Sequence, residues 1–529
     1  MYKKAFARRL KDNKFLVHLW EDSGYTKIEW DNQAYVECDE SEANYKGLNG
    51  EHLKKVKHYS SNNPKLHFHD MPPYQKFLVE KYGIDDTPST THKELFFDIE
   101  CEMLDDMSEE GLKKANKKIT SIAWYDKQVD EWGIVVLDEK GKNDNKKIIT
   151  KNKNKKIYYC LDEGELLARF LEIFRDIDPD IIVGWNSDYF DIPYLYYRMC
   201  KVLGSDFAKH LSPIGYVRET PWFKDQFIQI CGVESLDYMR LHKKFSWADE
   251  PSMRLDAIGE KYAGMKKIEY DGNLDKLFEE DIDKFIQYNF RDVEILKVLD
   301  ENLDYLALTK NLAHKGKHNY SEVYANTKTQ DGAISAYLLS KNIIPPAKDR
   351  NPISKKNYAG GYLFCPKAGK MDYLFDLDLT SLYPSIIMTI NIGKETYVGR
   401  IIDADDRNNR LGYNDLKCMD YAEEMVVENK KRQQTRVSIG RIVKNIEQHD
   451  LLISANGVMY SKDRESVLST ILKKWFDERV IYNDKKKEAK EAGNKKLAAA
   501  FHMKQYTMKI LLNSLYGATA LGSFRYGNV

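Results

Sequence analysis

The stretch Asp376-Leu-Asp-Leu-Thr-Ser-Leu-Tyr-Pro-Ser-Ile386 combines an alternating apolar pattern with two aspartates and a proline. The alternation runs over residues 373–379 and predicts a strand, with Phe375 and Leu377 on one side and Asp376 and Asp378 on the other. A carboxylate is costly to bury in such a strand without a partner, and a metal ion is a common partner. A strand end with an aspartate-initiated turn explains the same residues and remains the alternative.

The residues after Asp378 complete the pattern. Pro384 cannot donate to a ladder, so the strand is expected to end in a turn at residues 380–384. That turn exposes backbone N–H groups and Tyr383 beside the carboxylate. A magnesium-bound triphosphate fits this arrangement, with Asp378 on the metal, the N–H groups on phosphate and the Tyr383 ring under a sugar.

The composition limits the class of protein. The chain has 529 residues, too many for one core, so three or more domains are expected. Lys plus Arg and Asp plus Glu are each 82, but zero net charge does not exclude nucleic acid, because binding needs only a local basic surface. No apolar run approaches the roughly 20 residues of a membrane span, and the N-terminus lacks a signal-peptide pattern. Seven cysteines without a CxxC pair argue against zinc and disulfides and for a reducing cytoplasm.

A second group of acidic residues begins in a predicted strand. Residues 94–100 alternate, which places Asp98 and Glu100 on one face with Cα atoms about 7 Å apart. Farther along, a strand and turn lead to Asp191 at the start of a helix. This spacing suits joint ligation of divalent cations.

A predicted helix over residues 281–303 supplies the remaining members. Tyr288 and Asp292 lie four residues apart and therefore on one helix face. Acids gathered from a strand, a loop and a helix would make a two-metal site that cleaves a phosphodiester with water, which Tyr288 would orient. For each acid alone, a solvated surface charge is the alternative.

A helical hairpin is predicted near the end of the sequence. Residues 465–491 and 495–516 read as helices separated by Gly493 and Asn494. Arg479 and Lys509 lie about 21 Å and 24 Å from the tip at 1.5 Å per residue, so they are expected at similar heights. Lys509 shares a helix face with Asn513 and Tyr516, and such a wall would hold a triphosphate and stack on a base pair. An exposed, lysine-rich hairpin is the alternative.

Two weaker patterns lie between these elements. Residues 211–220 and 227–233 are expected to pair as a β-hairpin. The lysine-rich residues 140–156 are expected to form a solvated loop, with incidental DNA contact as the alternative.

These motifs resemble those of family B DNA polymerases, in the form seen in T-even-type phages. Residues 378–386 resemble motif A, and Lys509-Ile-Leu-Leu-Asn-Ser-Leu-Tyr-Gly517 resembles motif B. The exonuclease motifs are matched by Asp98-Ile-Glu100, by residues 186–191 and by Tyr288-x-x-x-Asp292, with Asp191 rather than Asp188 as the second-motif acid. Tyr358-Ala-Gly-Gly361 resembles the Tyr-x-Gly-Gly element of the family.

The resemblance implies an α/β and α+β multidomain fold. The expected order is a small N-terminal domain (1–93), an RNase-H-like 3′–5′ exonuclease domain (94–304), a return segment to the N-terminal domain (305–347), the first part of the palm (348–461), helical-hairpin fingers (462–518) and the start of a second palm segment (519–529).

The resemblance also implies roles for individual residues. The expected metal ligands are Asp98, Glu100, Asp191, Asp292 and Asp378, with Tyr288 as a further catalytic residue. The expected nucleotide-binding residues are Leu382, Tyr383, Arg479, Lys509 and Asn513, and the expected DNA-binding residues are Tyr358, Gly360, Gly361, Tyr516 and Gly517. The implied cofactors are two Mg²⁺ or Mn²⁺ ions per active site, and the implied partners are primer–template DNA and dNTPs.

One motif of the family is missing from the sequence. Polymerisation needs a second palm carboxylate, carried in the family by the Tyr-x-Asp-Thr-Asp motif C, and the sequence contains no Asp-Thr-Asp. We therefore expect the N-terminal portion of a proofreading DNA polymerase that is either split or truncated. In a split enzyme, a second polypeptide carries motif C and the thumb and provides the sliding-clamp contact. The alternatives are a stand-alone 3′–5′ single-strand DNA exonuclease with an inactive palm and a non-catalytic DNA-binding subunit. The expected location is the cytoplasm, which is the host cytoplasm if a phage encodes the chain.

Overall fold

The computed structural model describes residues 1–141, 143, 154–220, 228–246, 248–349, 364, 368–379, 381–402, 411–522 and 524–527. The chain divides into two compact units. Unit 1 consists of Met1–Asp31, Pro73–Leu78 and Asp85–Ala325, and unit 2 of Asn32–Pro72, Val79–Ile84 and Asn326–Val529. Helix α1 (Pro73–Tyr82) contributes residues to both.

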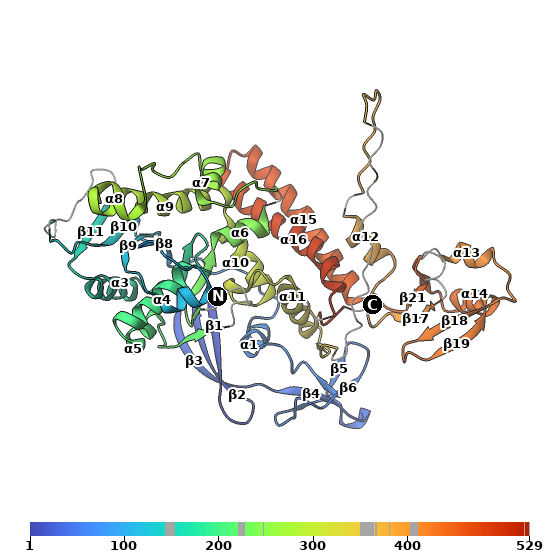
Figure 1. Ribbon diagram of the computed structural model, residues 1–529. Coiled ribbons are helices and arrows are strands. Elements are labelled where there is room, and N and C mark those ends of the chain that lie inside the picture. Colours follow the sequence, from blue (N-terminus) through green and yellow to red (C-terminus); the bar gives the residue numbers. More distant parts are fainter. Residues whose placement is uncertain are drawn as a thin grey trace. The chain divides into compact units, whose positions relative to one another are not determined.

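Unit 1 is built on a six-stranded mixed sheet, seen in Figure 1 in blue-green. The strand order is β11-β10-β9-β8-β12-β15. Strand β8 is antiparallel to β9 and parallel to β12. The strands are β8 (Glu94–Cys101), β9 (Ile119–Asp126), β10 (Glu131–Leu137), β11 (Asn154–Cys160), β12 (Ile181–Gly184) and β15 (Glu234–Asp237).

Helices cover both faces of this sheet. On one face, Phe97 and Ile99 of β8 join a hydrophobic core with α3 (Glu163–Ile177) and α4 (Asp191–Val202). The other face carries Asp98 and lies against α9 (Ile282–Leu303), the helix predicted from the sequence. The mixed α/β class is confirmed, and a mixed sheet covered on both faces is consistent with the RNase-H-like fold expected from the sequence.

The rest of unit 1 contains a second sheet and shorter helices. Strands β1 (Tyr2–Arg9), β2 (Lys14–Glu21) and β3 (Gly24–Asp31) form an antiparallel sheet. Strands β13 (Val217–Glu219) and β14 (Ile228–Ile230) pair antiparallel, which confirms the predicted pairing of these segments. The remaining α-helices are α2 (Glu109–Lys114), α5 (Ser205–Ala208), α6 (Tyr238–Phe245), α7 (Leu255–Ile258), α8 (Leu274–Glu280) and α10 (Tyr305–Gly316).

Unit 2 contains two five-stranded sheets. The first has the order β16-β5-β6-β4-β7, and β16 (Ile343–Ile344), which follows α11 (Asn326–Ser340), lies parallel to β5. Its other strands are β4 (Ala34–Glu37), β5 (Tyr45–Gly47), β6 (His52–Val56) and β7 (Leu66–His67). Strands from residues 34–67 and a strand from residues 343–344 therefore share one sheet.

The second sheet has the order β19-β18-β17-β21-β20. The side chains of Ile442, Val443 and Ile446 on α14 (Ile439–Gln448) pack in its core. The elements are β17 (Tyr397–Ile401), α13 (Tyr413–Lys417), β18 (Glu424–Asn429), β19 (Gln434–Ser438), β20 (Leu452–Ile453) and β21 (Val458–Tyr460). Strands β20 and β21 pair antiparallel, with Leu452 opposite Tyr460 and Ile453 opposite Met459.

The predicted helical hairpin is also confirmed. Helix α15 (Val467–Glu491) begins at its N-cap Ser466, and α16 (Lys495–Thr519) begins at its N-cap Asn494. Gly493 between them has φ +69°, a conformation that favours glycine, so the turn falls where the sequence placed it. None of the helices in the described ranges is long and apolar enough to span a membrane.

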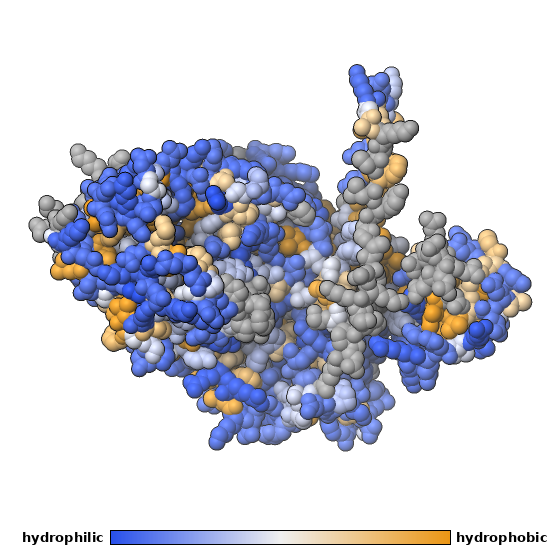
Figure 2. Space-filling model, in the orientation of Figure 1, coloured by the Kyte–Doolittle hydropathy of each residue, from blue (hydrophilic) through white to orange (hydrophobic). Residues whose placement is uncertain are grey.

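The predicted strand over residues 373–379 is wrong. The structure shows an extended segment that pairs with no strand in the described part of the chain, followed by α12 (Leu382–Thr389). Tyr373, Phe375 and Leu377 are 95%, 87% and 93% exposed. Figure 2 shows hydrophobic residues at the surface of this segment, which precedes α12. Alternation marks a face that can be buried, but a strand forms only when another backbone supplies the ladder.

Candidate functional site: an acidic cluster in unit 1

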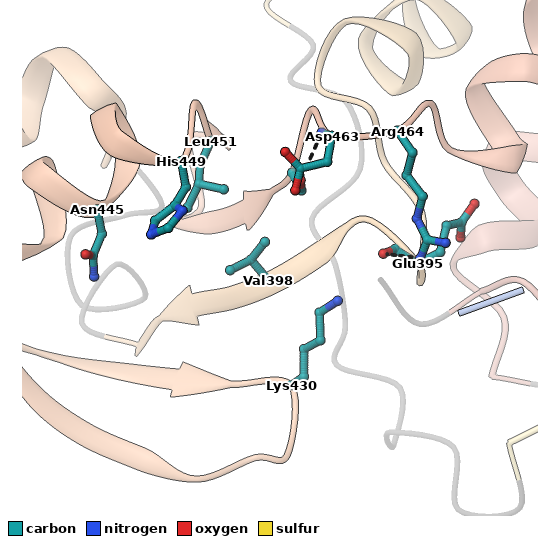
Figure 3. Close-up of a pocket in the computed structure, with 9 residues that line it drawn as sticks. Glu395, Val398, Lys430, Asn445, His449, Leu451, Asp463 and Arg464 are labelled. Carbon is teal, nitrogen blue, oxygen red and sulfur yellow. Dashed lines mark hydrogen bonds between the residues drawn. The ribbon is translucent and has the colours of Figure 1, made fainter. Parts of the chain in front are cut away.

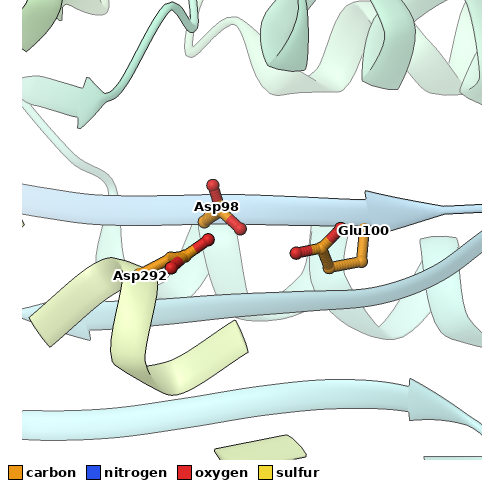
Figure 4. A group of neighbouring side chains, drawn as sticks. All are labelled: Asp98, Glu100 and Asp292. Carbon is orange, nitrogen blue, oxygen red and sulfur yellow. The ribbon is translucent and has the colours of Figure 1, made fainter. Parts of the chain in front are cut away.

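Three carboxylates meet where β8 faces α9. Asp98 and Glu100 are two residues apart on β8, so they point to the same side of the sheet, toward Asp292 of α9 (Figure 4). One carboxylate oxygen from each lies within 4.8 Å of the others. This spacing allows all three to ligate the same cation or a pair of cations.

Neighbouring polar groups fix the orientation of Asp98. Asn289, one turn before Asp292, donates from Nδ2 to Asp98 Oδ2 at 2.6 Å and accepts from Ser121 Oγ at 2.9 Å. Phe97 and Ile99, which flank Asp98, are 3% exposed and hold the strand from the opposite face. The fold therefore determines the direction of the carboxylate before any ligand arrives.

Asp191 lies next to the cluster without joining it. It is the first residue of α4, and its Oδ1 accepts a hydrogen bond from the backbone N–H of Ile99 at 3.3 Å. The structure therefore groups three of the four predicted acids closely and places the fourth against the same strand.

The electrostatics of the cluster favour a cation. Burial and the charges of Asp292 and Glu100 raise the pKa of Asp98 well above its usual value. Burial and the charge of Asp292 raise the pKa of Glu100 to about 8, and burial raises the pKa of Asp191 to about 7. Asp292 Oδ1 is buried and has no hydrogen-bond partner among the described residues. A divalent cation would provide the missing positive charge and a ligand for that oxygen, so these residues fit a metal site.

A lysine that the sequence analysis missed contacts the cluster. Lys267 Nζ lies 2.5 Å from Asp292 Oδ2 and 3.2 Å from the Tyr288 hydroxyl. Burial lowers the pKa of Lys267, but the charge of Asp292 more than offsets this effect and the ammonium stays charged. The adjacent Lys266 instead pairs with Glu260 at 3.0 Å and is exposed. Sequence gives no signal to separate these two lysines, because they lie in a loop without periodicity.

A cavity of about 650 Å³ opens beside the cluster. Its polar lining residues are Asp98, Asn186, Arg254, Asp256, Lys267, Tyr288 and Asp292. Its apolar and aromatic lining residues are Trp185, Met239, Met253, Leu255, Ile268 and Tyr270. This volume is within the roughly 300–1,000 Å³ of small-ligand pockets.

Asp188, set aside in the sequence analysis, has a structural partner. Its carboxylate accepts from Arg240 Nη1 at 2.7 Å and from Ser235 Oγ at 2.6 Å. Since Asp188 is buried and its charge is balanced by Arg240, it is not free to bind a cation in this arrangement.

The predicted polymerase residues lie in unit 2. Asp378 is exposed in the segment before α12, and among the described residues it belongs to no group of three or more acidic, histidine or cysteine side chains that could hold a metal. Tyr383 of α12 stacks on Tyr516 of α16, with ring centroids 4.1 Å apart and an interplanar angle of 13°. Leu382 beside Tyr383 is 41% exposed. The structure therefore brings together one residue from each of the two predicted nucleotide-binding elements.

The remaining predicted residues differ in their exposure to solvent. Arg479 of α15 is half-buried, with an Nε that has no hydrogen-bond partner among the described residues. Lys509 of α16 is half-buried, whereas Asn513 and Gly517 are exposed. The predicted residues Tyr358, Gly360 and Gly361 lie outside the described residues.

Comparison with known proteins identifies the family. A family model described as DNA polymerase family B matches residues 325–526, and one described as the exonuclease domain of DNA polymerase family B matches residues 62–258. The chain belongs to DNA polymerase family B. The DNA-directed DNA polymerase of Escherichia phage RB69 is 30% identical over 358 residues, which cover 66% of this chain and 36% of the relative.

Two further relatives give the same family. The DNA-directed DNA polymerase of Enterobacteria phage T4 is 32% identical over 46% of this chain and 28% of the relative. The DNA polymerase of Pyrococcus glycovorans is 25% identical over 85% of this chain and 50% of the relative. The family B chain thus spans half the length of these relatives or less.

The exonuclease match covers only part of the acidic cluster of this family B chain. Residues 62–258 include Asp98 and Glu100, but Asp292 and Lys267 lie beyond the end of the exonuclease match. The packing of α9 on β8 is what joins them. Asn289 could have been found from sequence, because it lies three residues before Asp292 on the same helix face.

Proposed function

We propose that the acidic cluster of unit 1 is a 3′–5′ exonuclease site for single-stranded DNA. The main support is that carboxylate oxygens of Asp98, Glu100 and Asp292 lie within 4.8 Å of one another, beside a cavity of about 650 Å³. Asp191, bonded to the same strand, would be the fourth acidic group. A non-catalytic DNA-binding subunit has no need of such a cluster, and so the cluster disfavours that alternative.

The residues of the chain have separable roles in this reaction. Two Mg²⁺ or Mn²⁺ ions held by the carboxylates would activate a water and stabilise the charge of the phosphodiester. The Tyr288 hydroxyl would orient that water, which attacks phosphorus while the bond to the 3′ oxygen breaks. The leaving oxygen takes a proton and a nucleoside 5′-monophosphate departs. Lys267 bonds to both Asp292 and Tyr288, which fixes the position of these side chains relative to each other. Its ammonium would place a positive charge beside the reacting phosphate.

A degradation assay tests this proposal. A 5′-labelled single strand incubated with the chain and Mg²⁺ should shorten from its 3′ end, and the Asp98→Ala variant should lose at least about 100-fold in rate. Tyr288→Phe should keep metal binding but lower the rate. A strand that stays intact with the wild-type chain and either metal would overturn the exonuclease assignment.

We further propose that unit 2 is part of a DNA-directed DNA polymerase that adds dNTPs to a primer–template. The match to residues 325–526 and the stacking of Tyr383 on Tyr516 support this role. In two-metal phosphoryl transfer, Asp378 would bind metal with a second aspartate, while Arg479 and Lys509 would contact the triphosphate. We also propose that the palm and fingers have the boundaries expected from the sequence.

The exposed segment before α12 supports a second polypeptide. Tyr373, Phe375 and Leu377 offer an apolar face together with a backbone that pairs with no strand among the described residues, which is the surface that a strand from another polypeptide covers. We expect that polypeptide to carry motif C and the thumb, and the sliding-clamp contact with it. Both polypeptides would then act in the same cytoplasm.

A primer-extension assay decides between polymerase and exonuclease alone. With dNTPs and Mg²⁺, the primer should shorten when the chain is alone and lengthen when the candidate partner is added. The exposure of Asp378, which belongs to no larger group of metal-binding side chains among the described residues, favours the alternative, a stand-alone exonuclease with an inactive palm. That alternative holds if the primer shortens in both cases and never lengthens.

A further inference from the structure

A second cavity lies in unit 2, between the β17–β21 sheet and the loop that leads to α15. Its volume is about 580 Å³, within the roughly 300–1,000 Å³ range of small-ligand pockets. The lining residues are Glu395, Val398, Lys430, Asn445, His449, Leu451, Ser461, Asp463 and Arg464 (Figure 3). None of them belongs to the proposed exonuclease or polymerase residues.

Two cations at this cavity form no ion pair with a described residue. Arg464 donates to two main-chain oxygens, Leu48 O at 3.1 Å and Glu395 O at 2.8 Å, and forms no ion pair with a described residue. Lys430, at the turn between β18 and β19, likewise forms no ion pair within the described ranges. Burial and the charge of Arg464 lower the pKa of Lys430, and the charge of Glu395 offsets only part of this effect, as expected for two cations that face the same space. An anion between them would relieve this repulsion.

The acids of the lining do not fill that role. The Glu395 carboxylate accepts the backbone N–H of Val467 at 2.5 Å, so it is committed to the first turn of α15. Burial raises the pKa of Glu395, while the backbone N–H of Val467 and the charges of Arg464 and Lys430 act in the opposite direction. Asp463 is exposed at the rim, and its backbone N–H donates to Ser461 Oγ at 3.0 Å.

The opposite end of the cavity has a different chemistry. Asn445 and His449 come from the last turn of α14 and its C-cap, and Figure 3 shows them grouped away from Arg464. Val398 lies between the two ends, and Leu451 lies beside His449. The cavity thus offers an amide and an imidazole at one end, apolar side chains in the middle and two cations at the other end.

We propose that this cavity binds a nucleotide, with its phosphate at Lys430 and Arg464 and its base against Val398 and Leu451. Asn445 and His449 supply hydrogen bonds to the edge of the base, while the cations supply charge-assisted bonds to phosphate oxygens. The ligand is a free nucleotide or the terminal nucleotide of a strand, since both present the same groups. The site is independent of the proposed exonuclease and polymerase activities.

Equilibrium dialysis of the full chain with labelled ATP in EDTA tests the site, because EDTA removes the metals that both active sites need. ATP should bind, and Lys430→Glu should weaken binding by about tenfold or more, the usual effect of losing a bond to a charged group. The matched control is Lys431→Glu, which reverses the adjacent exposed charge on the same turn outside the cavity and should change affinity by less than about twofold. All three proteins should degrade single-stranded DNA equally, which shows that unit 1 is folded.

Further arms identify what is bound. Arg479→Ala should leave ATP binding unchanged, which separates this cavity from the proposed polymerase site. Adenosine and inorganic tripolyphosphate should each bind more weakly than ATP, because each lacks one half of the contacts. If a 5′-phosphorylated oligonucleotide displaces ATP, the site binds the end of a strand. If the oligonucleotide does not displace ATP, the site binds a free nucleotide. The proposal is overturned if ATP does not bind, if Lys430→Glu and Lys431→Glu behave alike, or if tripolyphosphate binds as tightly as ATP.

Discussion

Lys267 Nζ contacts both Asp292 and Tyr288, at 2.5 Å from the carboxylate and 3.2 Å from the hydroxyl. A single ammonium therefore holds two side chains of α9 that are one turn apart. It is also a positive charge at the edge of a cluster of three carboxylates. Removing it should affect the reaction more than the stability of the fold.

The first prediction concerns this contact. Lys267→Ala should lower the exonuclease kcat by about 100-fold, the scale of losing one preorganised charged group beside a reacting phosphate. Lys267→Arg should recover part of the rate. The control is Lys266→Ala, whose partner is the exposed Glu260, and its rate should stay within about twofold of the wild type. Equal losses in the two alanine variants would show that Lys267 has no special role.

The second prediction concerns metal removal and pH. The pKa of Glu100 is about 8 in the folded chain, above the value of 4.5 for an unperturbed glutamate, so the native state holds a proton that the unfolded state has released. The free energy of unfolding should therefore fall as pH rises from about 4.5 to about 8 in EDTA.

Thermal unfolding measures this effect. Glu100→Gln cannot titrate, so the difference in Tm between the variant and the wild type should increase in favour of the variant from about pH 5 to about pH 8. Excess Mg²⁺ should remove that advantage, because the wild type gains a ligand that the amide holds poorly. A Tm difference that does not change with pH in EDTA would contradict the assignment of a high pKa to the cluster.

The sequence predicted this cluster well because its signals are local. Two-residue alternation is enough to place Asp98 and Glu100 on one face, and a four-residue spacing places Tyr288 with Asp292. Lys267 could not be predicted, since its role depends on where a loop passes α9. The strand predicted around Phe375 is absent for a different reason. Its alternating pattern is clear, but a strand there would need a partner strand that the described residues do not provide.

The third prediction concerns that exposed segment. The isolated chain should self-associate at micromolar concentration, and changing Phe375 and Leu377 to serine should weaken association by at least about tenfold, because each large apolar side chain contributes about 1.5–3 kcal/mol when covered. Light scattering after size exclusion measures this. Leu161→Ser, at a leucine that is 63% exposed in unit 1, is the control and should leave association unchanged. A compact, monodisperse wild-type monomer would contradict both this prediction and the proposed partner strand.

The fourth prediction concerns two histidines in unit 1. His92 Nε2 and His314 Nε2 lie 2.8 Å and 2.9 Å from the Tyr320 hydroxyl. Burial lowers the pKa of His92 to about 3 and that of His314 well below 6.5. Because both folded-state values are depressed, the unfolded state binds more protons below about pH 6.5, and stability should fall as the solution is acidified, by up to about 1.4 kcal/mol per pH unit for each histidine.

Acid unfolding of variants isolates this contribution. His92→Gln keeps a group that can bond to Tyr320 but cannot titrate, so it should flatten the loss of stability between about pH 6 and pH 4. His210→Gln, at an exposed histidine of the same unit, should not. If both variants follow the wild-type acid transition, the buried pair does not govern it.

The hydrogen bond from Asn289 to Asp98 joins residues 191 positions apart, and Asp292 follows three residues later. During synthesis, β8 therefore leaves the ribosome long before the helix that completes the cluster. Contacts of such sequence separation form late in folding, because the intervening chain must first be ordered. A nascent or prematurely terminated chain would hold Asp98 and Glu100 without Asp292 and could not assemble the cluster. The proposed nuclease activity would therefore begin only after the second half of unit 1 has been made and has folded.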